Sequence, residues 1–179
     1  MLRQTWILSF VLVLPLLPIP PSDLRAQESP PCEDVEGFHA LDFWVGSWKV
    51  FVGERQVGSN RIEKILNGCA IIENWMAVDG GEGKSLFFYQ PATDTWKQVW
   101  VTGRATRTAG VKEKTMVLRT ETEVRFEGLV PVSGAAPVLD RTTLTRLADG
   151  TVRQVIEANL PDEGWRTMFD ALYRPAEDP

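Results

Sequence analysis

From residue 48 to residue 174 the chain alternates short apolar runs with clusters of turn residues, and it shows almost no helical periodicity. This spacing is typical of an all-β protein whose consecutive strands are joined by hairpins. Such hairpins form an up-and-down meander, and closing it into a barrel removes both exposed edges. The predicted fold is an all-β, antiparallel up-and-down β-barrel of about ten strands, at residues 48–53, 59–66, 69–78, 84–90, 95–103, 114–120, 123–130, 138–147, 151–159 and 164–174.

The turns between these runs have recognisable chemistry. Residues 79–83 and 148–150 combine Asp with Gly, which adopts the positive φ angles of a tight reversal. Residues 91–94 and 161–164 begin with Pro, which fixes φ at the first corner of a turn. These four turns support the predicted hairpins.

Residues 38–47 precede the first strand and differ from the rest of the chain. Phe38, Leu41, Trp44 and Val45 fall at helical spacing, which predicts one or two turns of helix. Trp44 can bury a large apolar surface, and Gly46 lets the chain turn tightly beside it. We predict a short N-terminal helical plug that closes one end of the barrel and leads directly into the first strand.

The N-terminal residues have the layout of a secretory signal peptide. Arg3 precedes an apolar run over residues 6–17, prolines follow, and Ala26 offers a cleavage site. We predict a signal peptide at 1–26, a flexible lead at 27–37, a barrel domain at 38–174 and a tail at 175–179. The alternative is an uncleaved anchor, although the run is shorter than a spanning helix. The expected localisation is exported, either periplasmic or secreted, with no stable membrane anchor.

The remaining chain of about 150 residues is long enough for one domain with a full core. The net charge of the full chain is −5 at pH 7, and no cluster of Lys or Arg offers a surface for phosphate backbones. Nucleic acid is therefore excluded as a partner. The sequence leaves the oligomeric state open.

Cys32 and Cys69 are the only two cysteines. In an oxidising compartment they could form a disulfide that ties the lead segment to a core strand. By the chain-entropy argument such a bridge contributes on the order of 3–4 kcal/mol. The alternative is that Cys69 is a small buried residue and Cys32 a free thiol.

The segment from Phe43 to Val50 resembles the Gly-x-Trp opening of the calycin superfamily, which includes lipocalins and fatty-acid-binding proteins. The chain is more closely similar to a bacterial domain family, often exported, that has a Phe-x-Trp-x-Gly-x-Trp opening and no settled activity. The resemblance covers residues 38–174 and implies a lipocalin-like barrel. It also implies that an Arg of the last strand, Arg174 or Arg166, packs near Trp48. The other blocks that carry it are Gly68-Cys69-Ala70, Ser85-Leu86-x-Phe88-Tyr89, Trp96-x-Gln98-x-Trp100 and Arg153-Gln154.

A barrel of this size can hold one small ligand. Alternation along the predicted strands groups large aromatic side chains with isolated polar ones, which is the composition of a ligand pocket. Buried amides also favour a cavity, because they are costly to bury without partners. The alternative is ordinary core packing. The predicted ligand-binding residues are Glu73, Trp75, Trp96, Gln98, Trp100, Arg153 and Phe169.

Glu73 and Glu157 are the candidate catalytic residues, because a carboxyl group buried among Trp side chains acquires a raised pKa suited to acid–base chemistry. The alternative is that each faces solvent or pairs with an Arg. The lone His39 lacks a nearby nucleophile, and one His with two distant Cys is a poor metal site. We expect no metal and no cofactor.

These observations predict an exported protein that binds a small apolar or amphipathic molecule in its barrel. An isomerase, cyclase or hydrolase that uses an interior Glu is one alternative, so the sequence leaves open whether the protein is an enzyme. A structural or partner-binding protein with a packed barrel is the other.

Overall fold

The computed structural model describes residues 30–104 and 110–176. The predicted signal peptide at 1–26, and the parts of the lead and tail at 27–29 and 177–179, lie outside the described residues. None of the described helices is long and apolar enough to span a membrane.

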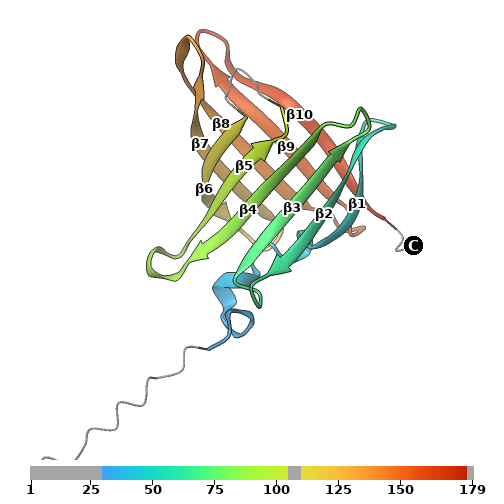
Figure 1. Ribbon diagram of the computed structural model, residues 1–179, viewed down its shortest axis with the longest axis vertical. Coiled ribbons are helices and arrows are strands. Elements are labelled where there is room, and N and C mark those ends of the chain that lie inside the picture. Colours follow the sequence, from blue (N-terminus) through green and yellow to red (C-terminus); the bar gives the residue numbers. More distant parts are fainter. Residues whose placement is uncertain (1–29, 105–109, 177–179) are drawn as a thin grey trace, which may run out of the picture.

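Ten antiparallel strands form one closed barrel, in which β1 pairs with both β2 and β10 (Figure 1). The predicted fold class is confirmed, because each strand pairs antiparallel with the next strand in sequence and β10 closes the ring on β1. The strands are β1 (Gly46–Val52), β2 (Arg55–Ile65), β3 (Ala70–Ala77), β4 (Glu82–Gln90), β5 (Thr95–Thr102), β6 (Val111–Arg119), β7 (Glu123–Val132), β8 (Ala135–Arg146), β9 (Val152–Leu160) and β10 (Gly164–Pro175).

The predicted short helical segment before β1 is present and consists of 3-10 turns. They are η1 (Cys32–Asp34), η2 (Glu36–His39) and η3 (Asp42–Trp44), and η4 (Pro91–Thr93) lies between β4 and β5. Phe38, Leu41 and Trp44 recur every three residues, and side chains at this spacing eclipse one another in a 3-10 helix. All three are buried, whereas Val45 is exposed.

We call residues 32–44 the plug, because Leu41 and Trp44 in this segment belong to the core at one end of the barrel; Figure 1 shows the segment in blue below the strands. The Trp44 ring packs edge-on against Phe87 and Tyr173, at centroid distances of 5.5 and 6.1 Å. The backbone oxygen of Trp44 accepts a hydrogen bond of 2.9 Å from Nε1 of Trp48. The opening tryptophans thus join the plug to β1.

A disulfide between Cys32 and Cys69 attaches the plug to the turn between β2 and β3. Nε1 of Trp96 donates a 2.8 Å hydrogen bond to the backbone oxygen of Gly37 and adds a second attachment at β5. A Cβ atom at Gly37 would lie 2.4 Å from the Tyr89 ring, so only glycine lets the plug approach this closely.

His39 also holds the plug in place. Its Nδ1 lies 2.6 Å from Oδ2 of Asp42, and its Nε2 lies 2.8 Å from the backbone oxygen of Glu33. Both nitrogens can donate at once only when the ring is protonated. The hydrogen bond to Asp42 is the main cause that raises the pKa of His39, and the bond to Glu33 adds to it; nearby Lys64 opposes them.

Because the folded-state pKa of His39 is raised, its protonation contributes stability that is fully present below the unfolded-state pKa, near pH 6.5, and is lost as pH rises through the folded-state value. We expect a His39→Gln variant to be less stable than the wild type at pH 6 and to approach it at pH 8.5. Because the ring is 41% exposed, the difference is less than about 1 kcal/mol. Urea unfolding at both pH values measures it, and a pH-independent difference would contradict this role.

Candidate functional site

A cavity of about 320 Å³ lies in the half of the barrel away from the plug. Its walls come from β3, β5, β6, β8, β9 and β10, at positions where strand alternation directs side chains inward. One wall is apolar and the other is polar. The apolar wall contains Trp75, Trp100, Ile156, Met168 and Phe169.

Each of two indole rings lies over a glycine on the strand next to its own. A Cβ atom at Gly83 would lie 2.1 Å from the Trp100 ring, and one at Gly58 would lie 2.5 Å from the Trp75 ring. Each ring therefore covers a glycine on the barrel wall. Trp75 also packs edge-on against Phe169, with ring centroids 6.3 Å apart. This arrangement leaves space between the aromatic side chains and the polar wall.

Glu73 is the carboxyl group of the polar wall, and it is 4% exposed. Its Oε1 accepts a 2.7 Å hydrogen bond from Nδ2 of Asn60, and its Oε2 lies 2.5 Å from the Ser85 hydroxyl. Burial raises the pKa of Glu73, while the bonds from Ser85 and Asn60 and the charge of Lys114 oppose the rise. The net rise means that burial outweighs the hydrogen bonds.

Gln98 extends this network from β4 to β5. Its Nε2 donates a 3.1 Å hydrogen bond to Ser85, while its Oε1 is buried without a partner among the described residues. The Gln98 side chain borders the cavity and is only 7% exposed. A buried amide oxygen without a donor is costly, and a rotation of the Gln98 side chain toward the cavity would present this oxygen to a ligand donor.

Tyr173 and Gln154 complete the polar wall on β9 and β10. The Tyr173 hydroxyl donates a 2.8 Å hydrogen bond to Oε1 of Gln154 and accepts a 3.4 Å bond from Asn60. Burial, helped by the charge of Glu73, raises the pKa of Tyr173 well above its ordinary value. The phenol is therefore a neutral hydrogen-bonding group at every physiological pH.

Two lysines of β6 also line the cavity. Lys112 and Lys114 both form ion pairs with Asp140 on β8, and Nζ of Lys112 lies 2.6 Å from Oδ2. Nζ of Lys114 also donates a 2.6 Å hydrogen bond to the Thr142 hydroxyl. Burial lowers the pKa of Lys114, and Asp140 opposes the shift.

Gly128 explains how a lysine of β6 reaches an aspartate of β8. It lies opposite Asp140 in the intervening strand β7, so no side chain separates the two charged groups. A Cβ atom there would lie 2.0 Å from the backbone oxygen of Glu113. The ion pairs thus depend on the absence of a side chain at one position of β7.

The structure places five of the seven predicted ligand-binding residues around the cavity: Glu73, Trp75, Gln98, Trp100 and Phe169. Trp96 instead packs against the plug in the core. Arg153 was predicted to face the cavity, but it lies on the outer face of the barrel and pairs with Asp170 at 2.6 Å. Its neighbour Gln154 takes the inward position.

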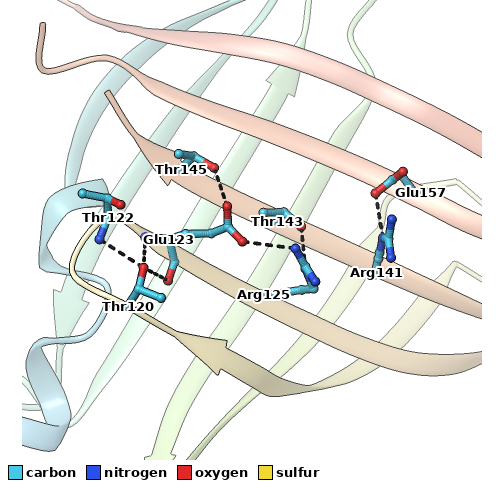
Figure 2. A network of polar contacts seen from close by, with 8 residues as sticks. All are labelled: Thr120, Thr122, Glu123, Arg125, Arg141, Thr143, Thr145 and Glu157. Atoms are coloured by element: carbon cyan, nitrogen blue, oxygen red, sulfur yellow. Dashed lines mark hydrogen bonds and ion pairs between the residues drawn. The ribbon is translucent and has the colours of Figure 1, made fainter. Parts of the chain in front are cut away.

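Glu157, the second catalytic candidate, also lies on the outer face of the barrel. It pairs with Arg141 at 2.6 Å, and the Arg141 guanidinium stacks 3.9 Å from the centroid of the Trp165 ring. Figure 2 shows this pair beside a second outer group, in which Arg125 bonds to Glu123 and Thr143. These polar contacts join β7, β8 and β9 on the side of the wall away from the cavity.

Sequence reasoning missed the lysines, the aspartate and Tyr173. Lys112, Glu113 and Lys114 form a charged run, which is typical of residues exposed to solvent. The predicted strand also began only at residue 114. The available signal was Gly128, since an inward glycine in the strand beside Asp140 leaves room for a long side chain from the strand beyond. Among the described residues no group of three His, Cys, Asp or Glu side chains could hold a metal ion.

Searches of protein-family models and of curated proteins find no match to this chain.

Proposed function

We propose that this protein binds a small apolar or amphipathic molecule in the barrel cavity. The observation that carries the proposal is a 320 Å³ space between an aromatic wall and a polar wall that contains Gln98, whose buried amide oxygen has no partner among the described residues. Ligand sites are typically apolar concavities with a few oriented polar groups. If the barrel had only a structural role, we would expect side chains to fill this volume, because protein interiors are close-packed. The cavity therefore favours binding over the packed-barrel alternative.

We also propose that the chain belongs to the calycin superfamily and to the exported family with the tryptophan-rich opening. The closed antiparallel barrel is consistent with this assignment. Two details differ from the expected pattern. Phe43 directly precedes Trp44, and the Arg174 guanidinium lies over Phe51, 4.4 Å from its centroid, rather than over Trp48.

Export to an oxidising compartment is part of the proposal. The Cys32–Cys69 disulfide supports it, because such bonds persist mainly in secreted and periplasmic proteins. Extraction and mass spectrometry of the protein purified from its own host would test both the location and the presence of a bound molecule.

An enzyme is the second candidate, and the buried carboxyl group of Glu73 favours it. A raised pKa at the border of a cavity suits a general acid or base. Glu73→Gln keeps the shape and removes the charge. If this variant binds an apolar dye normally and converts every tested compound as the wild type does, charge-based chemistry at Glu73 is excluded.

The binding proposal is tested by filling the cavity. Ile156→Trp places an indole in the space, and we expect it to weaken binding of the neutral dye N-phenyl-1-naphthylamine at least tenfold, measured by fluorescence titration. The matched control is Val155→Trp, because Val155 is the adjacent residue and faces outward. Equal dye affinity in folded Ile156→Trp would place the dye outside the cavity and contradict the proposal.

A further inference from the structure

We propose that the ligand is a compact aromatic acid whose anionic group binds Lys112 and Lys114 and whose neighbouring N–H or O–H group donates to Gln98. This inference rests on the proposed binding function and names the ligand class of the same cavity.

The two lysines have donor capacity that the described residues do not use. Each ammonium has three N–H donors. Lys114 uses two of them on Asp140 and Thr142, and Lys112 uses one on Asp140. Three donors on two cations therefore remain for groups in the cavity. Carboxylates form short, charge-assisted hydrogen bonds with such donors.

The charges of the wall also favour an anion. Lys112 and Lys114 bring two positive charges, and Asp140 compensates only one of them. The other carboxyl group of the wall is Glu73, whose two oxygens are already held by Asn60 and Ser85. The whole chain, by contrast, has a net charge of −5. Two lysines with unused donors thus line the cavity of an acidic protein.

The position of Gln98 determines where the ligand carries its donor. Gln98 and Lys114 are direct partners across β5 and β6, so their side chains leave the wall side by side. The unpartnered Oε1 of Gln98 accepts a hydrogen bond but cannot donate one. A ligand that satisfies both residues presents its anionic group and its N–H or O–H group on the same edge.

The apolar wall determines the body of the ligand. Trp100 is the cross-strand partner of Lys112, so an aromatic ring stacked on this indole directs its acid group at the lysines. Trp75 and Phe169 close the side next to Trp100. A volume of about 320 Å³ is at the lower end for small-molecule pockets and suits a fused ring system rather than a long acyl chain.

Three probes of nearly equal size test the inference on the wild-type protein. Indole-2-carboxylate carries the anionic group and the N–H on one edge, indole-2-carboxamide lacks the charge, and 1-methylindole-2-carboxylate lacks the donor. We expect the carboxylate to bind at least tenfold more tightly than the amide and about tenfold more tightly than the methylated acid. Isothermal titration calorimetry measures all three dissociation constants.

Three variants assign the effect to residues. Lys112→Met removes one cavity cation, and we expect it to abolish most of the preference for carboxylate over amide. Lys84→Met is the control, because Lys84 lies on the outer face of β4 and contacts Asn74. In Gln98→Leu we expect indole-2-carboxylate and 1-methylindole-2-carboxylate to bind equally well. The carboxylate should still bind more tightly than indole-2-carboxamide.

The outcomes separate this inference from the proposed function. If the protein binds N-phenyl-1-naphthylamine but binds the amide as tightly as the carboxylate, the ligand class is wrong and the binding function stands. If neither the dye nor any indole binds, the binding function itself fails. An equal loss of preference in Lys84→Met and Lys112→Met would assign the effect to overall charge and overturn the inference.

Discussion

Replacing Trp44 with alanine is expected to lower the free energy of unfolding by about 3–5 kcal/mol, the range for truncating a fully buried aromatic side chain. The Trp44 ring has no exposed surface and contacts Phe87 and Tyr173 from two sides. The barrel end next to the plug would keep the resulting void, because closed hydrogen bonding around β1 to β10 limits collapse of the wall.

Two control variants make the measurement specific. Nε1 of Trp44 is buried without a hydrogen-bond partner among the described residues, so Trp44→Phe removes an unsatisfied donor and should cost less than about 1.5 kcal/mol. Trp165 is 36% exposed on the outer face, and its replacement by alanine should cost about 1 kcal/mol or less. Urea unfolding gives all three values. Similar losses in Trp44→Ala and Trp165→Ala would show that the plug does not anchor the barrel.

The strand pattern was predictable because it depends on local chemistry. Gly150, Gly164 and Asp162 have φ angles of 83°, 70° and 64°, and residue types that tolerate such angles identify turns in a single sequence. The grouping of Trp96, Gln98 and Trp100 on one face followed from alternation alone. Even so, Trp96 packs against the plug while Gln98 and Trp100 border the cavity, because depth along the barrel is a tertiary property.

Which side chains of β10 point into the barrel could not be predicted. Alternation placed Trp165 and Phe169 on the same face, but the register of β9 and β10 shifts between Thr167 and Phe169. One additional residue, Met168, exchanges the two faces, so that Trp165 lies outside under Arg141 and Phe169 lies inside. Nothing in the residues around Thr167 indicates a bulge before the neighbouring strand is known.

The cationic part of the cavity was also beyond single-sequence reasoning. A Lys in a strand ordinarily faces solvent, because its burial requires a partner. The partner of Lys114 is Asp140, which β7 separates from it in the sheet. The registers of β6, β7 and β8 bring these residues together across Gly128, so their pairing becomes visible only once the strands are aligned.

This buried pair leads to the second large prediction. Lys114→Met leaves Asp140 with Lys112 as its one remaining cation and leaves the Thr142 hydroxyl without its donor. Loss of one member of a buried ion pair typically costs about 3–5 kcal/mol. Because Lys112 stays in place, we expect a loss of about 3 kcal/mol in the free energy of unfolding, measured by urea denaturation at pH 7.

The double variant Lys114→Met/Asp140→Asn provides the decisive comparison. Burial lowers the pKa of Lys114 despite the neighbouring Asp140, which means that the pair does not fully compensate the desolvation of the ammonium. We therefore expect the double variant to recover most of the stability that Lys114→Met loses, with a coupling energy of about 2 kcal/mol or more. Additive losses in the two single variants would mean that the charges do not interact, and Lys112 with Lys114 could then no longer be treated as one cationic site.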